Sequence, residues 1–348
     1  MNIVRKGFDL FYDSIKPVVF SLTAKDPETA HKLFVNFCRT LDGVGLAKLV
    51  FDNDSNGLNP DFKISNAAGF NKNGKIPPNI LRYLGFDRNV VGTVTYDSWN
   101  GNPRPRTRRY IDGESLVNWM GLPGEGANFI FDKLSSYGFQ IPTTISIMST
   151  PGKQGEEALR DIESTVLTFR NLSYVRRFQL NTSCPNTHNQ SGELDARKEN
   201  ERWLGDMLGV VRNTAYANQE IELKVSPDLN KDEVQNTIII SKGYVGGFIT
   251  TNTTRIHDTE HIPESPGKGV ASGNALYSRS LEIQKMFDEV KKLNGLDFRI
   301  TACGGIDSIG KLKERLANGA TEIEIYTPFI FKGPKLLREL RTYIPNLS

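Results

Sequence analysis

Cysteine is scarce in this chain, and a long apolar run is absent. The 348 residues include three cysteines, Cys38, Cys184 and Cys303, which lie far apart and form no Cys-x-x-Cys pair. This odd, widely spaced set argues against a disulfide scaffold and favours a reducing compartment. No stretch approaches the roughly 18 apolar residues of a membrane-spanning helix. The first residues also lack the apolar core and cleavage site of a signal peptide.

Charge of one sign is equally sparse. The net charge is +3, and no long run of like charge occurs. Because a basic stripe is the usual footprint of nucleic-acid binding, no nucleic-acid partner is expected. His188, His257 and His261 have no metal-ligand spacing, so no metal site is predicted. Hydrophobic residues and glycines together make up roughly 47% of the chain, which is typical of a globular protein with a sizeable core.

Residues 1–45 are expected to form a pair of short amphipathic helices. The first carries its apolar residues near one face and is expected to end at Pro17. After the apolar segment Val18–Leu22, Asp26 is placed to cap a second helix that begins at Pro27. Two interpretations of this pair remain open. It is either a helical cap on a larger domain or an element that lies in the membrane interface.

From residue 62 onward, short apolar runs alternate with helical patterns, and this predicts a (β/α)8 barrel over residues 46–348. The alternative is an open doubly wound sheet, but no Gly-x-Gly-x-x-Gly follows the first strand. The expected strands are Ser65–Gly69, Asn89–Gly92, Thr144–Met148, Phe178–Asn181, Ile221–Val225, Gly247–Thr251, Phe298–Ala302 and Glu322–Tyr326. The expected helices are Pro78–Leu84, Gly155–Leu172, Glu199–Ala215, Lys231–Lys242, Ser278–Leu293 and Ser308–Asn318.

The ends of the predicted strands carry the residues that indicate chemistry, because barrel enzymes place their active sites there. Glycines after the last two strands, and in the loop at residues 267–273, are typical of phosphate binding by backbone N–H groups. Lys224 follows apolar residues at a strand end, where a solvated charge is not expected. Together these ends indicate a planar, phosphate-bearing cofactor in the barrel mouth, with a second flat polar ligand beside it.

The turn after the fourth predicted strand holds Asn181, Cys184 and Asn186. Amide side chains donate and accept hydrogen bonds, which suits a ring with both N–H and C=O groups. A cysteine between them could take a proton from that ring. Taken alone, the segment is more typical of a polar turn after a strand, in which Cys184 is a small buried filler.

Ordered motifs occur from about Asp26 to Pro334, at residues 67–72, 92–95, 101–106, 181–187, 224–229, 251–254, 304–308 and 326–334. These motifs resemble those of the dihydroorotate dehydrogenase family, the FMN enzymes of pyrimidine synthesis. The resemblance implies oxidation of dihydroorotate to orotate, with hydride transfer to FMN and Cys184 as the general base. It implies substrate contacts by Lys72, Asn118, Asn181, Asn186, Asn252 and Thr253. It implies FMN contacts by Ala68, Gly69, Lys72, Thr93, Ser146, Asn181, Lys224, Thr251, Ser272, Gly273, Gly304, Gly305, Tyr326 and Thr327.

The N-terminal motif at residues 26–31 is similar to that of the quinone-using, class 2 members. In those members, the positions of His31, Arg109 and Tyr326 line the quinone tunnel. The resemblance therefore implies a peripheral protein on the cytoplasmic face of the cell membrane, attached by its N-terminal helices. Two features depart from this class. Its base is usually serine rather than cysteine, and Ser146 stands where an asparagine usually contacts the flavin.

Three other functions remain open. Cys184 and the segment 118–123 are typical of class 1 members, which would make fumarate or NAD the acceptor and the protein cytoplasmic. A related FMN barrel, such as a dihydropyrimidine or dihydrouridine reductase, also uses a cysteine near flavin but has no comparable N-terminal helices. A non-enzymatic flavin-binding module would leave Cys184 between two asparagines unexplained.

Overall fold

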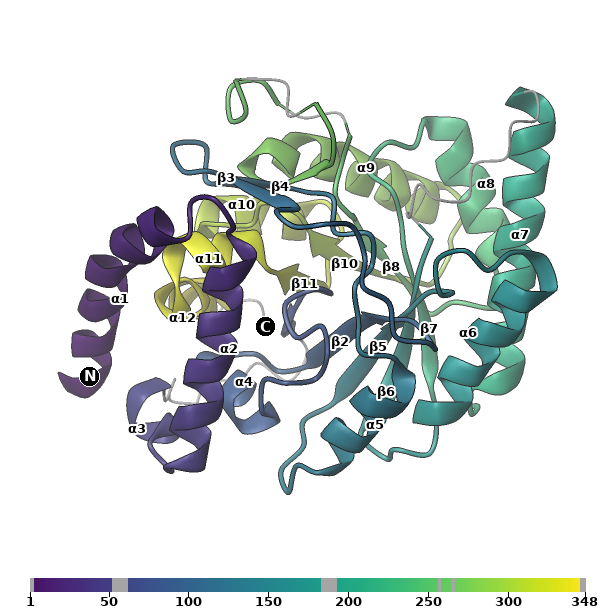
Figure 1. Ribbon diagram of the computed structural model, residues 1–348. Coiled ribbons are helices and arrows are strands. Elements are labelled where there is room, and N and C mark those ends of the chain that lie inside the picture. The colour runs from purple at the N-terminus through teal and green to yellow at the C-terminus, as the bar shows by residue number, and fades with distance from the viewer. Residues whose placement is uncertain (1–2, 52–61, 183–192, 256–257, 264–266, 345–348) are drawn as a thin grey trace.

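The computed structural model describes residues 3–51, 62–182, 193–255, 258–263 and 267–344. Eight parallel strands form one sheet in the order β1-β11-β10-β8-β7-β6-β5-β2. A parallel bridge between Ser65 and Arg88 brings its two edges together into a barrel. The predicted eight-stranded barrel is therefore confirmed (Figure 1). Its strands are β1 (Lys63–Asn66), β2 (Asn89–Val94), β5 (Thr143–Ile147), β6 (Val175–Asn181), β7 (Glu220–Lys224), β8 (Gly247–Thr250), β10 (Arg299–Cys303) and β11 (Glu322–Ile325).

Helices surround the barrel and bury their apolar faces on it. All six predicted helices are present, with shifts of a few residues at their ends. Local sequence sets some of these ends: Asn230 and Glu233 form a capping box at the start of α8. The helices of the barrel are α4 (Pro78–Leu84), α5 (Ala127–Ser135), α6 (Gly155–Phe169), α7 (Glu193–Thr214), α8 (Lys231–Ser241), α9 (Asn274–Leu293), α10 (Ile309–Ala317), α11 (Thr327–Lys332) and α12 (Pro334–Tyr343).

A small antiparallel sheet covers one side of the barrel mouth. It consists of β3 (Thr107–Tyr110), β4 (Ser115–Asn118) and β9 (Val270–Gly273), in the order β3-β4-β9. Two of these strands come from the long segment between β2 and β5, and the third precedes α9. The sequence indicated only that the long segment was functional. The sheet brings Asn118 to the end of β4, directly opposite Val270 on β9.

The N-terminal helices are α1 (Ile3–Leu22), α2 (Glu28–Gly43) and α3 (Ala47–Phe51). The prediction that Pro17 ends the first helix is wrong, because α1 continues through it to Leu22. A proline within a helix removes one backbone hydrogen-bond donor. The last helical turn of α1, after Pro17, is held by packing instead, because the Phe20 ring lies edge-on to Phe331 at a centroid distance of 5.7 Å. The predicted cap is also wrong. Asp26 forms an ion pair with Arg104 instead, and α2 begins at Glu28 without a side-chain cap.

Helices α2 and α3 share a hydrophobic core with the barrel. Cys38, Leu41 and Phe51 belong to the same buried cluster as Ile64 on β1 and Leu337 on α12. Helix α1 lies beside α11 and α12 at the edge of this assembly (Figure 1). The hydrophobic core is continuous on both sides of residue 45. The division into two domains at that residue stays a prediction.

Polar contacts attach α1 to the C-terminal helices. The Tyr12 hydroxyl donates to the Ile330 carbonyl at 2.7 Å, and Lys16 Nζ donates to the Phe331 carbonyl at 2.7 Å. Asp13 pairs with Lys335 at 2.6 Å. These contacts fix α1 across the opening that leads into the barrel mouth.

Candidate active site

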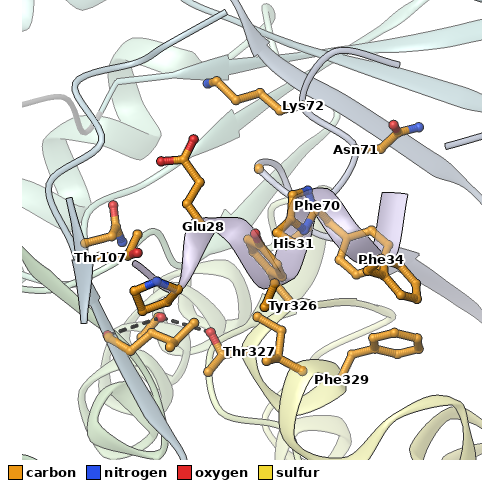
Figure 2. Close-up of a pocket in the computed structure, with 18 of the residues that line it drawn as sticks. Glu28, His31, Phe34, Phe70, Asn71, Lys72, Thr107, Tyr326, Thr327 and Phe329 are labelled. Atoms are coloured by element: carbon orange, nitrogen blue, oxygen red, sulfur yellow. Dashed lines mark hydrogen bonds between the residues drawn. The ribbon is translucent and has the colours of Figure 1, made fainter. Parts of the chain in front are cut away.

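A single cavity of about 1140 Å³ connects the barrel mouth with the space between α1 and α2. Its inner wall consists of strand ends and glycine-rich turns. Its outer wall is formed by α1 and α2 and is mainly apolar, with side chains such as Phe11, Ile15 and Leu33 beside a few charged residues that include Lys16 and Arg39. One space therefore has a polar, buried end and an apolar end at the N-terminal helices. Figure 2 shows part of the wall between them, with His31 and Phe34 projecting from α2 near Tyr326 and Phe329.

A chain of side-chain hydrogen bonds crosses the floor of the barrel mouth. Thr93 Oγ1 lies 3.1 Å from Ser146 Oγ and accepts a hydrogen bond from Asn181 Nδ2 at 3.0 Å. Asn252 Nδ2 donates to Asn181 Oδ1 at 3.0 Å, and the Thr253 backbone N–H donates to Asn252 Oδ1 at 2.9 Å. These contacts come from four different strand ends. They hold both amides in defined orientations, as recognition of a planar polar ring requires.

Two lysines lie at the inner end of the cavity. Lys72 Nζ donates to the Thr93 carbonyl at 3.3 Å. Lys224 is 4% exposed, and its ammonium lies 2.8 Å from Glu324 Oε2 and 3.7 Å from Cys303 Sγ. Burial alone would lower the pKa of Lys224, but Cys303 and Glu324 raise it above its ordinary value. Lys224 is therefore a buried cation whose charge is balanced by the carboxylate of Glu324.

The glycine-rich turns meet at one side of the cavity. Ser272 Oγ lies 2.9 Å from Thr327 Oγ1, a contact drawn in Figure 2. Gly305 packs so closely on Gly273 that a Cβ at residue 305 would lie 2.7 Å from the Gly273 carbonyl oxygen. Gly304 has a φ of +125°, a conformation that favours glycine. This wall offers hydroxyls and backbone amides in a small space, a donor set that suits phosphate.

Aromatic rings surround His31 at the middle of the cavity. Its ring centroid lies 6.2 Å from that of Phe70 and 6.3 Å from that of Tyr326. Desolvation lowers the pKa of His31 to about 4, with Glu28 acting in the opposite direction. His31 is therefore neutral at physiological pH. Burial also raises the pKa of Tyr326, so this side chain keeps its phenolic proton.

Two arginines join the N-terminal helices to β3 and the segment before it. Arg109 Nη2 donates to the Thr23 carbonyl at 2.9 Å, and the guanidinium lies 4.2 Å from the Phe20 ring centroid. Arg106 binds both carboxylate oxygens of Glu28 at 3.0 Å. Burial alone would raise the pKa of Glu28, but Arg106 and Arg104 lower it. These pairs fix the cavity wall where α2 meets the barrel.

Most of the residues predicted from the sequence lie together in this cavity. Its lining includes Ala68, Gly69, Lys72, Asn118, Lys224, Thr251, Asn252, Thr253, Ser272, Gly273, Gly304, Gly305, Tyr326, Thr327, His31 and Arg109. Thr93, Ser146 and Asn181 lie behind the lining, in the hydrogen-bond chain described above. Cys184 and Asn186 lie outside the described residues. Their roles, like those of the other predicted site residues, stay predictions.

Sequence reasoning missed several members of the site. Glu324 was not singled out, although the alternation of glutamate and isoleucine in β11 indicates one charged face inside the barrel. Glu28 and Thr107 also line or face the cavity (Figure 2). No spacing rule indicates that these residues, far apart in the chain, meet. Elsewhere, Asp258, Glu260 and His261 place their possible ligand atoms within 4.8 Å of one another.

Comparisons with known proteins agree with this arrangement. The family model for dihydroorotate dehydrogenase matches residues 55–347. A protein of Enterobacter sp. strain 638 named dihydroorotate dehydrogenase (quinone) is 30% identical, over 96% of this chain and 100% of that protein. One of the same name from Natronomonas pharaonis is 29% identical, over 94% of this chain and 92% of its own length. The Eimeria tenella enzyme in complex with ferulenol superposes with a TM-score of 0.77 at 22% identity, over 95% of this chain and 94% of that chain.

Proposed function

The chain belongs to the dihydroorotate dehydrogenase family, and we infer that it oxidises dihydroorotate to orotate with a quinone as electron acceptor. The family match and the relatives confirm the resemblance drawn from the sequence motifs. The observation that carries the choice of acceptor is the single cavity. It joins a polar barrel mouth to an apolar opening between α1 and α2. A soluble acceptor would not need that apolar opening.

The residues of the barrel mouth fit FMN. The hydroxyls of Ser272 and Thr327 and the backbone of Gly273, Gly304 and Gly305 would hold its phosphate. Lys224 would lie near the pyrimidine part of the ring, with Ala68 and Gly69 leaving room for the ring's approach. Thr93, Ser146, Asn181 and Thr251 would complete the contacts. When bound, FMN would accept a hydride from the substrate and supply electrons to the acceptor.

The asparagines would bind the substrate. Asn118 and Asn252 line the cavity, and Asn252 is already oriented by its hydrogen bond to Asn181. Lys72 and Thr253 lie in the same lining and would contact the substrate beside them. Asn186, which lies outside the described residues, would supply a further amide. Such preset donors and acceptors recognise the amide edges of a pyrimidine and hold it for reaction.

Cys184 would act as the general base that removes a proton from C5 of dihydroorotate, while a hydride leaves C6. A free thiol has a pKa near ~8.5, so part of it is ionised near neutral pH. Serine, with a far higher pKa, needs a proton relay for the same step. The use of cysteine therefore does not conflict with a quinone acceptor, since the base and the acceptor serve different half-reactions.

The N-terminal helices would receive the quinone from a membrane surface. Among the described residues, no helix is long and apolar enough to cross a bilayer. Helix α1 nevertheless exposes Leu10, Phe11, Val18 and Leu22, the last of them 81% exposed. A helix with such a face binds in the plane of the interface. His31, Arg109 and Tyr326 would line the quinone path, and the protein would be peripheral on the cytoplasmic face of the cell membrane.

Anaerobic mixing tests this proposal in two stages. The purified protein should be yellow, and dihydroorotate should bleach its flavin. Quinone, fumarate or NAD is then added separately to the reduced enzyme. Only quinone should restore the oxidised flavin spectrum rapidly. Failure of dihydroorotate to bleach bound FMN would overturn the reaction, and reoxidation by fumarate or NAD alone would overturn the acceptor. Reduction by NADPH without dihydroorotate would instead identify a reductase.

A further inference from the structure

A fully buried arginine lies behind the glycine turn that follows β10. Arg315, on α10, is 0% exposed. Its Nη2 donates to the Gly304 carbonyl at 2.8 Å and to Ser280 Oγ at 2.9 Å, and its Nη1 donates to Gln284 Oε1 at 3.0 Å. The guanidinium carbon lies 4.9 Å from the Tyr277 ring centroid. All of these partners are neutral.

No carboxylate pairs with Arg315 within the described parts of the chain, and its Nε is buried without a hydrogen-bond partner. The adjacent acid, Glu314, accepts from the Tyr277 hydroxyl at 2.5 Å. By contrast, the buried guanidinium of Arg177 contacts Glu220, Glu222 and Glu322. A buried charge without a counter-ion is costly, so proteins rarely retain one without a partner.

Arg315 remains charged in this environment. Burial lowers its pKa to about 10, which is still well above neutral pH. The half-buried lysines nearby are balanced within the protein, because Lys311 lies 3.1 Å from Asp307 and Lys332 lies 3.6 Å from the same carboxylate. Among the described residues, Arg315 is therefore a cation with no carboxylate in direct contact, and Glu314 acts on it only from a distance.

The residue that Arg315 holds belongs to the cavity wall. Gly304 and Gly305 both line the cavity, next to Gly273 and Thr327. Ser280, which accepts from Arg315, donates in turn to the Cys303 carbonyl at 2.6 Å, and its Oγ lies 3.2 Å from the Thr250 carbonyl oxygen. The guanidinium thus connects the ends of β8 and β10 and fixes the carbonyl of the turn between β10 and α10.

We propose that Arg315 is a positioning residue for the phosphate of FMN, acting through the Gly304–Gly305 turn without touching the cofactor. Its buried charge complements the phosphate across one peptide group, and its hydrogen bond to Gly304 holds the turn in its binding conformation. This inference rests on the proposed function, because it takes the ligand of the turn to be FMN. It distinguishes FMN from riboflavin, which has the same ring and lacks the phosphate.

The test compares the two flavins on the apoprotein by quenching of flavin fluorescence. Arg315→Gln removes the charge and keeps a donor, and it should lower FMN affinity by about 10- to 100-fold, the effect of a lost charged interaction. Riboflavin affinity should change by less than about twofold. Arg315→Lys, which keeps the charge, should retain most of the preference for FMN. Arg341→Gln is the matched control, because Arg341 is another largely buried arginine but pairs with Asp87 at 2.7 Å, away from the cavity.

The outcomes separate the possible failures. Equal losses for both flavins in Arg315→Gln, or an unchanged FMN affinity, would overturn the inference. If the wild-type protein bound both flavins equally, the inference about Arg315 would be wrong and the proposed function would stand. If it bound neither flavin, the proposed function would be wrong as well. Should the glutamine variant not fold, the Nε resonance of Arg315 in the ¹⁵N-labelled wild-type apoprotein gives a second measurement. It should shift on addition of FMN and not of riboflavin, and equal shifts would overturn the inference.

Discussion

The ammonium of Lys224 lies 2.8 Å from the carboxylate of Glu324, and both side chains are buried inside the barrel. The other oxygen of this carboxylate accepts from Gln179 Nε2 at 2.6 Å. The proposed flavin site therefore has a negative charge next to its lysine, and this charge lowers the electron affinity that Lys224 alone would give the flavin.

Glu324→Gln should raise the midpoint potential of the bound flavin. The change removes a negative charge and leaves that of Lys224 uncompensated, which favours the more negative, reduced flavin. A shift of about 30 mV corresponds to roughly 1.4 kcal/mol for two electrons, and we expect at least this much in an anaerobic spectral titration. Glu289→Gln, at a surface pair with Lys231, is the control. An unchanged or lower potential in Glu324→Gln would contradict the expectation.

Cys184→Ala should leave FMN bound but slow its reduction by dihydroorotate by at least ~100-fold, as for other lost general bases. Stopped-flow absorbance of the flavin measures this rate. Cys184→Ser should restore part of the rate only at higher pH, because the alcohol is harder to ionise. Cys38→Ala is the control, since Cys38 is a buried core residue of α2. If the alanine variant is reduced at the wild-type rate, Cys184 is not the base.

Glutamate substitutions on the exposed face of α1 should impair quinone reduction and leave the reduction of the flavin by dihydroorotate unchanged. Val18→Glu and Leu22→Glu change side chains that are 55% and 81% exposed. A charge there opposes burial in a lipid interface. We expect weaker sedimentation with phospholipid vesicles and a several-fold higher KM for a long-chain quinone. Leu293→Glu, at a position that is 76% exposed at the end of α9, should change neither quantity. Equal effects at both places would argue against a membrane role for α1.

His31 should make the protein less stable in acid. Its folded pKa is about 4, below its ordinary value of 6.5, so the unfolded state takes up the proton first as the pH falls. Its stabilising effect is complete above pH ~6.5 and is lost towards pH ~4, with a slope of at most roughly 1.4 kcal/mol per pH unit. His31→Phe should flatten the decline in unfolding free energy over this window, measured by urea titration. An unchanged slope in His31→Phe would refute the assignment.

Periodicity and strand-end chemistry were enough to predict the barrel. Short apolar runs separated by helical patterns located all eight strands of the barrel, because buried parallel strands are almost continuously apolar. Local rules failed where tertiary contacts outweighed them. Pro17 does not end α1, since Phe20 packs on Phe331, and Asp26 binds Arg104 instead of capping α2. Arg315 could not be found from the sequence, because its helix resembles any amphipathic surface helix and only the fold places it behind Gly304.

The attachment of α1 to α11 and α12 also orders events during synthesis. Helix α1 is made first, and the carbonyls and side chains that hold Tyr12, Lys16 and Asp13 belong to residues 330–335. At ~5–20 residues per second, α1 waits roughly 15–60 s before its partners emerge from the ribosome. Until then α1 can pack only on the segments that follow it directly, as Phe8 does on Phe37 and Phe51. A lipid surface or a chaperone can therefore reach α1 before α11 and α12 do.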